Sequence, residues 1–308
     1  MKYISKIIIT NIILVLIAVS IIIMTMMLLK LKSTETNLAH SLTQKFMISS
    51  EHKLNDFFET VGRAILVEKE RKQQTSYLNM SESQVVDYFM PILKNYPQIS
   101  SIGIANEKSY EIDLFSDGEE VFTRKIDLKI DDNAAQFNQW KKEGDSLYII
   151  KSWNNPLLKL PSERDWHNNA MKKLYNNEVT WTTPYIFNTN SEIGLTASIG
   201  WEDKYTNEIT ILAYDVTLTN LTNFTKDIKT TPNSMTFIVS ESLDYIALPN
   251  NKVIKNPKEA LLKSIHQVNI PTVVHAFNHW EENKALLTQT FKYTSNNKFV
   301  GYKTNENN

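Results

Sequence analysis

The chain has 308 residues, of which 42% are hydrophobic, enough to build the cores of two domains of ordinary size. It has no cysteine, which excludes disulfides, thiolate zinc sites and cysteine nucleophiles. Its seven glycines form neither G-x-x-x-x-G-K nor G-x-G-x-x-G, so nucleotide chemistry is not expected. Beyond residue 32, acidic residues outnumber basic ones and leave a charge of −5, against a formal net charge of −1 for the whole chain. This acidic balance argues against a nucleic-acid partner.

An apolar stretch runs from Ile7 to Leu29, with only Thr, Asn and Ser as polar interruptions. At 1.5 Å per residue it spans a hydrocarbon core about 30 Å thick, and it exceeds the apolar core of a cleavable signal peptide, which has about 7 to 15 residues. We therefore expect residues 1–32 to form a cytoplasmic tail and an uncleaved anchor in the inner (cytoplasmic) membrane. Two lysines flank each side, so their number does not set the orientation. Because a short tail is easier to leave in the cytoplasm, we expect everything after Lys32 to lie outside.

A long helix is predicted after the anchor. Residues 33–75 contain no proline, and their apolar positions repeat at helical spacing: Leu38, Leu42, Phe46, Leu54, Phe57, Val61 and Ile65. This stripe can pack against the chain's own domain, or it can pair with a second copy to form a homodimer. A Ser-x-x-Gln capping box at 81–84 predicts a second helix through about Asn95, ended by Pro97.

Short apolar segments separated by turn residues follow and predict an antiparallel sheet. Residues 100–105, 110–115 and 121–128 are expected as three strands in meander order. After an irregular middle, the segments 181–187, 194–201 and 208–218 supply three more, and 217–228 reads as a helix. The expected fold class is therefore α+β, a sheet flanked by helices.

A smaller module with the same order is expected from about Ser234. Residues 234–240 and 244–250 are predicted as a hairpin, 256–268 as a helix, and 284–294 and 298–304 as two more strands. The predicted organisation is residues 1–32 as tail and anchor, 33–80 as stalk helix, 81–232 as a membrane-distal lobe and 233–308 as a membrane-proximal lobe.

Residues 164–224 contain a recognisable series: RDWHNNAM, WTTPYIF, GLTASI and ILAYDVTLTNLTNF. Together with the anchor, the stalk and the two lobes, this series resembles the double Cache sensor domains of bacterial transmembrane receptors. The resemblance implies two PAS-like lobes, each with an antiparallel sheet flanked by helices, and a ligand pocket in the distal lobe. Carried over by position, it implies that Arg164 binds a ligand carboxylate with the indole of Trp166 beside it. It implies further that Tyr185 is the later tyrosine of the pocket and that Asp215 binds an ammonium.

The sequence departs from the family pattern at two positions. His167 and Lys159 stand where the amino-acid-binding members have tyrosine. His167 would add to the pocket a donor or acceptor whose charge depends on pH. The expected ligand is therefore a small polar molecule, amino-acid-like or amine-like.

Several expected site residues also have a structural explanation, and Arg164 could be a surface residue that shields the indole of Trp166. Asp215 precedes a predicted helix and could be its N-cap, and Trp181 and Tyr185 could simply pack a strand end. His275, His279 and Glu282 have a spacing that could hold zinc, but Ala276 replaces the glutamate of a metalloprotease. A structural helix is favoured there, and neither a metal nor any other cofactor is expected.

The predicted function is the extracytoplasmic sensor region of a membrane-bound signal-transduction receptor, without enzymatic activity of its own. Ligand binding would close the distal lobe, because a ligand shifts a conformational equilibrium only when it binds one state better. We expect the 308 residues to be the front of a longer receptor; a complete protein that signals through a partner is the alternative. A membrane-tethered hydrolase using His167 and Asp215, or a structural envelope protein, are the rival functions.

Overall fold

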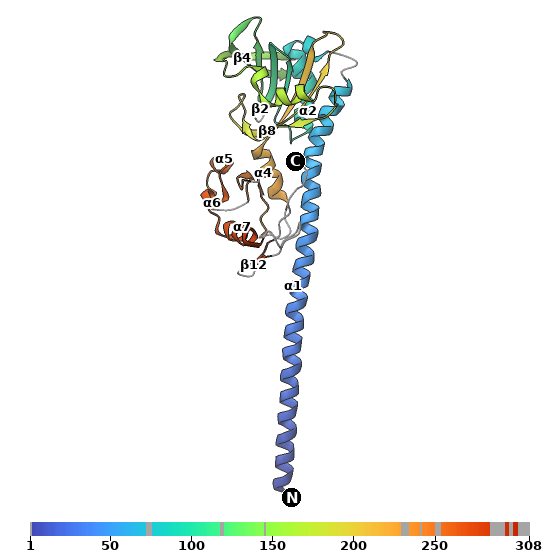
Figure 1. Ribbon diagram of the computed structural model, residues 1–308, viewed down its shortest axis with the longest axis vertical. Coiled ribbons are helices and arrows are strands. Elements are labelled where there is room, and N and C mark those ends of the chain that lie inside the picture. Colours follow the sequence, from blue (N-terminus) through green and yellow to red (C-terminus); the bar gives the residue numbers. More distant parts are fainter. Residues whose placement is uncertain are drawn as a thin grey trace. The chain divides into compact units, whose positions relative to one another are not determined.

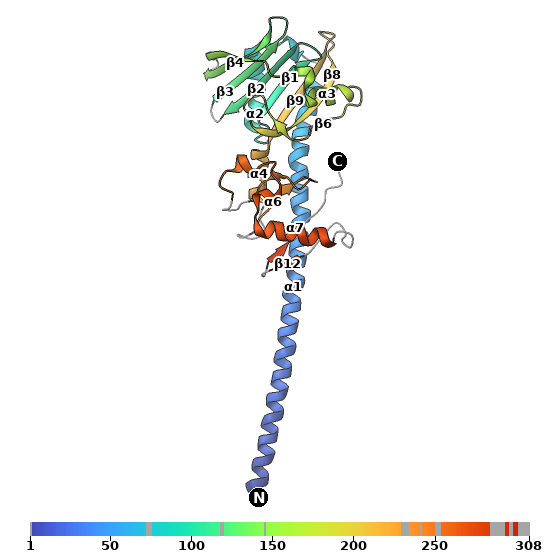
Figure 2. The same cartoon turned by 60° about the vertical axis from the view of Figure 1, so that its left-hand side comes forward.

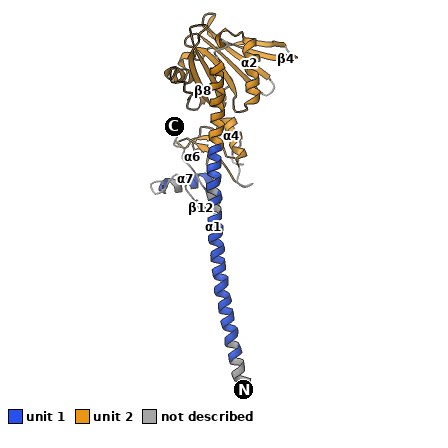
Figure 3. Ribbon diagram, turned by 90° about the vertical axis from the view of Figure 1, so that its right-hand side faces the viewer, with its two compact units in different colours: residues 1–52, 271–308 blue, residues 53–270 orange. Residues whose placement is uncertain are grey.

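The computed structural model describes residues 2–71, 76–117, 120–144, 146–228, 234–240, 242–249, 254–283, 293–295 and 298–300. These residues form two compact units, residues 53–270 and residues 1–52 with 271–308, which Figure 3 shows in different colours. The expected lobe boundaries at 80 and 232 remain predictions.

The anchor and the stalk form one continuous helix, α1 (Lys2–Arg71). Within it, Asn11–Glu35 has a mean hydropathy of 3.1 and is long and apolar enough to cross a membrane. The predicted apolar stripe has two parts along the helix. Leu38 and Leu42 are exposed, whereas Phe57, Val61 and Ile65 are buried in the core of the unit formed by residues 53–270. The sequence pattern thus marks a packed helix face only in its last third.

Nine strands form one antiparallel sheet, with the order β5-β4-β3-β2-β1-β9-β8-β6 and β7 paired to β8 (Figure 2). Its centre is the predicted meander of β1 (Ser101–Asn106), β2 (Tyr110–Asp117) and β3 (Glu120–Asp127), and β9 (Ile209–Thr217) pairs with β1. β8 (Ile193–Glu202) follows β9, as expected for 194–201. The predicted α+β class is confirmed.

The two faces of the sheet have different chemistry because side chains alternate along each strand. One face is apolar and packs on the last third of α1 and on α2 (Glu82–Asn95), the helix opened by the predicted Ser81–Gln84 capping box. Figure 1 labels α2 and the strands β2 and β8 of this sheet. The buried strand residues of this apolar face include Ile102, Ile104, Ile112, Leu114, Ala197, Ile199, Trp201, Leu212, Tyr214 and Val216. The opposite face carries the candidate site.

The segment expected to be irregular contains the two longest strands, β4 (Asp131–Glu143) and β5 (Ser146–Pro156), so that expectation is wrong. They form a hairpin at the edge of the sheet, and β5 is mostly exposed. A register shift between Gln139 and Trp140 breaks the alternation of polar and apolar residues. With that alternation lost, hydrophobic periodicity could not reveal the strands.

The expected strand at 181–187 is two short strands, β6 (Thr180–Trp181) and β7 (Tyr185–Ile186), because Pro184 lies between them and cannot donate to the ladder. Before them, the short helix η2 (Pro161–Glu163) and α3 (Asp165–Lys172) lead from β5 to this region. Trp181 lies edge-on to Phe58 of α1 at 5.2 Å, so the packing explanation holds for this tryptophan.

Helix α4 (Leu218–Asp227) follows β9 as expected, but its N-cap is Thr217, whose hydroxyl accepts from the backbone N–H of Asn220 at 3.1 Å. The suggested N-cap role of Asp215 is therefore wrong. Asp215 lies inside β9, and its side chain lines the cavity on the opposite face of the sheet.

The C-terminal segments match the predicted module in part. β10 (Ile238–Val239) and β11 (Tyr245–Ala247) form the expected hairpin. The helix expected over 256–268 is instead two short ones, α5 (Pro257–Ala260) and α6 (Ile265–Val268), because Leu262 between them has φ 58°. Residues 271–283 form α7 (Pro271–Asn283), and β12 (Tyr293–Ser295) pairs with β13 (Lys298–Val300). The remainder of the last two predicted strands lies outside the described residues.

Candidate binding site

The strand registers place a polar group in the middle of the second sheet face. Gly103 of β1 lies opposite Asp113 of β2 on one side and Ala213 of β9 on the other. Two residues away along the same face, Ser101 is paired with Asp215. Glycine and alanine therefore form a low floor between two carboxylates, because their side chains do not fill the space above the sheet.

A small cavity of about 280 Å³, including its open mouth, lies over this floor. It is lined by Gly103, Asp113, Arg164, Trp166, Tyr185, Phe187, Asn188, Thr189, Ala213 and Asp215. The walls come from the start of α3, from β7 and from the residues after it. An aromatic wall, a cation and two carboxylates thus share one concavity.

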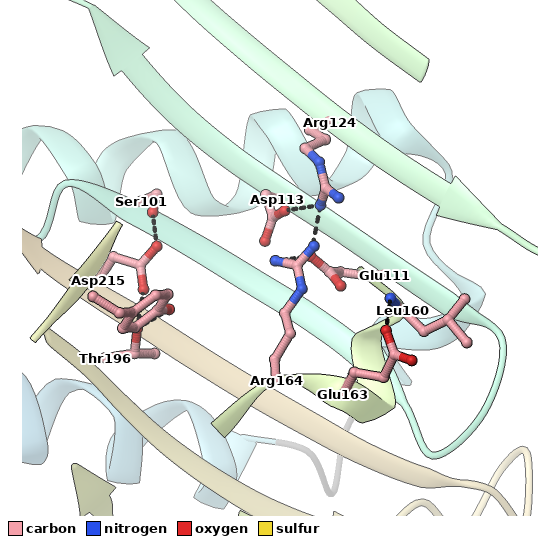
Figure 4. A network of polar contacts seen from close by, with 10 residues as sticks. Ser101, Glu111, Asp113, Arg124, Leu160, Glu163, Arg164, Thr196 and Asp215 are labelled. Atoms are coloured by element: carbon pink, nitrogen blue, oxygen red, sulfur yellow. Dashed lines mark hydrogen bonds and ion pairs between the residues drawn. The ribbon is translucent and has the colours of Figure 1, made fainter. Parts of the chain in front are cut away.

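Arg164 reaches across the sheet toward a cluster of buried charges, shown in Figure 4. Its Nη1 lies 3.0 Å from Oε1 of Glu111, and Arg124 Nη1 lies 2.7 Å from the same oxygen and 2.9 Å from Oδ2 of Asp113. All four side chains are less than a tenth exposed. A buried charge group of this kind is stable only when its members compensate one another.

The two carboxylates of this cluster differ in acidity. Burial raises the pKa of Glu111, but Arg164 and Arg124 outweigh it, so the net pKa is below its usual value. Burial, reinforced by the negative charge of Glu111, raises the pKa of Asp113 well above its usual value despite Arg124. Asp113 is therefore the group of the pair that takes up a proton more readily.

The Asp215 carboxylate is held by two hydroxyl groups. Ser101 donates to Oδ2, and Thr196 donates to Oδ1 at 2.5 Å while its own oxygen lies 2.6 Å from the Tyr185 hydroxyl. Burial raises the pKa of Asp215 to about 6, against the opposing effect of these hydrogen bonds. Ionised at neutral pH, this carboxylate faces the cavity with lone pairs that the hydroxyls do not occupy.

Several polar atoms near the cavity are buried without a partner. They are Nε and Nη2 of Arg164, Oε2 of Glu111, Oγ1 of Thr189 and Nδ1 of His167. Buried polar atoms in folded proteins are usually paired, and leaving one unpaired costs about 1–3 kcal/mol. The two free donors of Arg164, a residue that lines the cavity, call for an acceptor from a bound molecule.

The structure brings together Arg164, Trp166, Tyr185 and Asp215 from the predicted set, but not His167. His167 is a buried residue of α3, with Nε2 3.0 Å from the backbone oxygen of Asn106, and it does not line the cavity. Burial lowers its pKa despite that hydrogen bond, so the ring is mainly neutral at pH 7. Its predicted role in ligand contact remains a prediction without geometric support.

Sequence reasoning missed Glu111, Asp113 and Arg124. A signal for them exists: Glu111 and Asp113 alternate with Ile112 and Leu114 in a strand that ends up at the centre of the sheet. Such a strand has no solvent-exposed face, so its charged residues must either pair with one another or line a site. Recognising this requires knowing that the strand is central, which the sequence pattern does not reveal.

The zinc alternative finds no support among the residues that the structure describes, which hold no group of three or more His, Asp or Glu side chains able to bind a metal ion. His275 and Glu282 lie in α7, and the side chain of His279 is outside the described set.

Comparison with known proteins gives matches among solved structures. No protein-family model matches the chain, and neither does any curated protein. The ligand-binding domain of the Campylobacter jejuni chemoreceptor Tlp3, in complex with 4-methylisoleucine, is 16% identical, with 83% of this chain and 82% of that chain covered and a TM-score of 0.47. That of the Pseudomonas fluorescens chemoreceptor CtaA, with L-isoleucine, is 13% identical, with 86% and 85% covered and a TM-score of 0.44. That of the Pseudomonas aeruginosa chemoreceptor PctC, with GABA, is 14% identical, with 75% and 80% covered and a TM-score of 0.41.

All three of these structures are ligand-binding domains of chemoreceptors. At TM-scores of 0.41 to 0.47 this similarity decides nothing about the function of this chain.

Proposed function

We propose that this chain is the extracytoplasmic small-molecule sensor region of a membrane receptor, and that it binds a small polar ligand bearing an ammonium group in the cavity over β1, β2 and β9. The observation that carries the proposal is the pair of unpartnered donors on the buried guanidinium of Arg164, in a cavity that also exposes Asp113 and Asp215. A ligand with an acceptor oxygen and an ammonium would satisfy both kinds of group.

The aromatic wall fits the same role. Trp166 and Tyr185 line the cavity, and Phe187 lies edge-on to Tyr185 at 5.1 Å. Aromatic rings pack against the apolar part of a ligand, and their faces attract a cation.

The side-chain geometry supports binding rather than hydrolysis. A hydrolase built on His167 and Asp215 needs the imidazole beside the substrate. The described position of His167, bonded through Nε2 to the Asn106 backbone oxygen, does not offer it to the cavity. Occupancy, and the change of conformation that it favours, would be the signal.

The membrane-related part of the proposal rests on α1. Asn11–Glu35 would cross the inner membrane once, with the cavity outside the cytoplasm. The exposed Leu38 and Leu42 would pack against the same residues of a second copy, giving a homodimer through the stalk.

A thermal-shift screen of the full chain in detergent tests the function. Amino acids, amines, purines and organic acids would be added one at a time, and a ligand at 100 times its Kd should stabilise the chain by about 2.7 kcal/mol, a rise in Tm of several degrees. The rise should disappear in Arg164→Ala and Asp215→Ala. Lys159→Ala, which removes an exposed cation before α3, is the matched control and should keep the full shift.

Because Arg164→Ala leaves Glu111 with less compensation, Arg164→Lys is the second variant: it keeps the charge but loses the guanidinium donors. A hit retained in all the site variants would show that the ligand binds elsewhere. If no compound shifts the Tm, the sensor proposal fails, and the result favours a structural role in the cell envelope.

A further inference from the structure

We propose that Asp113 is a second ammonium-binding carboxylate in this cavity, and that the site selects a small primary amine with one net positive charge and a neutral acceptor over a zwitterion. The inference rests on the proposed function, and it narrows the ligand to one chemical class. Four observations carry it: the position of Asp113, the existing partner of Arg164, the balance of buried charges and the free donors.

Asp113 is positioned to contact a ligand as well as Arg124. Its Oδ2 is paired with Arg124, while its Oδ1 lies over Gly103, only 2.8 Å from where a Cβ at that position would be. The missing side chain of Gly103 therefore leaves this oxygen at the floor of the cavity, on the same strand pair as Asp215. Two carboxylates facing one small space form a natural seat for an ammonium, which has three donors.

Arg164 already has a carboxylate partner within the protein. Its Nη1 already lies 3.0 Å from Glu111, so part of its charge is compensated within the protein. A ligand carboxylate at Nε and Nη2 would also approach the negative charges of Glu111 and Asp113 in a buried region, where repulsion is poorly screened. A neutral carbonyl or hydroxyl oxygen would satisfy the same two donors without this repulsion.

The balance of ionisable groups points the same way. The groups facing the cavity or its charge cluster are Glu111 and Asp113 from β2, Arg124 from β3, Arg164 and neutral His167 at α3, Tyr185 from β7 and Asp215 from β9; Glu107 acts on His167 from the loop after β1. With Asp113 protonated in the empty cavity, the negative charges of Glu111 and Asp215 are balanced by the two guanidinium groups. A ligand cation that displaces the Asp113 proton keeps the set neutral, whereas a zwitterion whose ammonium pairs with an ionised Asp113 leaves one negative charge uncompensated.

The raised pKa of Asp113 fits this assignment. Burial and the neighbouring Glu111 favour its protonated form when the cavity is empty. An ammonium beside Oδ1 would stabilise the ionised form, and the proton would pass to solvent.

The test compares matched ligands on the full chain in detergent by titration calorimetry at pH 7. The probes are L-alaninamide, L-valinamide and L-leucinamide, each against the corresponding free amino acid. The amide keeps the ammonium and replaces the carboxylate by a neutral carbonyl. We expect at least one amide to bind about tenfold more tightly than its amino acid.

Asp113→Asn tests the residue itself. It should weaken amide binding about tenfold, because the amide loses an ion pair with its ammonium. Free amino acid binding should change by less than about threefold, because the same substitution also removes a negative charge that repels the amino acid's carboxylate. Asp117→Asn is the matched control because Asp117 lies on the same strand but is exposed. Equal loss for both ligand classes would reduce Asp113 to a structural role and overturn the assignment.

The wild-type comparison stands even if Asp113→Asn does not fold. Free amino acids that bind as tightly as their amides would overturn the proposed charge selection. If neither class binds but another compound gives an Arg164-dependent thermal shift, this inference fails while the sensor function stands. If no compound in the screen binds, both fail.

Discussion

At the scale of single residues, the buried carboxylate of Asp215 lowers the stability of the folded chain. Its carboxylate is buried, and its pKa of about 6 lies above the ordinary 3.8. A folded-state pKa above the unfolded one means that the folded chain holds the proton more tightly. The group therefore costs no stability below about pH 4, and its cost grows as the pH rises through 6.

Asp215→Asn removes this titration. We expect the variant to gain stability relative to the wild type as the pH rises from 4 to 7, by roughly 1–3 kcal/mol. Denaturant unfolding of both proteins at a series of pH values measures the difference. Hydrogen bonds lost from Ser101 or Thr196 would shift the difference equally at every pH, so its slope is the readout. A flat difference would mean that Asp215 has an ordinary pKa.

The site residues found from the sequence are those in a local motif. Arg164, Trp166 and Tyr185 are close in the chain, and Asp215 ends an apolar run, so the pattern could be recognised without the fold. Asp113 and Arg124 enter the site only through strand pairing, since Asp113 lies opposite Gly103 and Arg124 lies opposite Asp113. Their partnership depends on register, which a single sequence does not specify.

At the scale of elements, the strands around the cavity meet where two glycines make room. Gly194 of β8 lies where a Cβ would overlap the ring of Phe187 and the backbone oxygen of Val216. The backbone oxygen cannot move without breaking the β8–β9 ladder, and Phe187 is part of the cavity wall. Gly194 thus couples the sheet to the shape of the site.

Gly194→Ala should destabilise the chain by about 1–3 kcal/mol, because it overpacks a site that cannot relax, and it should also weaken ligand binding through Phe187. Gly62→Ala is the control: this glycine lies inside α1 with no atom within 4 Å of an added Cβ. Because alanine is the better helix former, that variant should gain about 0.5–1 kcal/mol. Thermal unfolding of both variants measures these changes in stability. If Gly194→Ala leaves the Tm unchanged, β8 can shift to make room for the added methyl group, and the expected overpacking is wrong.

Elements were predictable where a local signal marked them. The capping box Ser81–Gln84 fixed the start of α2, and turn residues separated β1, β2 and β3. The hairpin of β4 and β5 escaped because much of its surface is exposed, so its residues need not alternate clearly, and because a bulge shifts the pattern midway. The break between α5 and α6 was not predicted because Leu262 adopts a left-handed backbone conformation, which leucine rarely does and which its identity therefore does not indicate.

At the scale of the whole molecule, the proposed function depends on which side of the membrane the cavity would face. The lysines on the two sides of the apolar stretch are equal in number, so charge does not decide the orientation. A cavity that reads extracellular or periplasmic solutes requires a cytoplasmic N-terminus.

The absence of cysteine makes the orientation directly measurable, because a single introduced thiol is then the only one in the chain. Lys129→Cys, at an exposed turn after β3, should react with a membrane-impermeant maleimide in cells whose inner membrane is intact. Lys2→Cys, before the apolar stretch, should react only after the membrane is opened, and it serves as the matched control. The reverse pattern would place the cavity in the cytoplasm, where Arg164, Asp113 and Asp215 would meet intracellular amines. The sensor would then report on metabolism rather than on the surroundings of the cell.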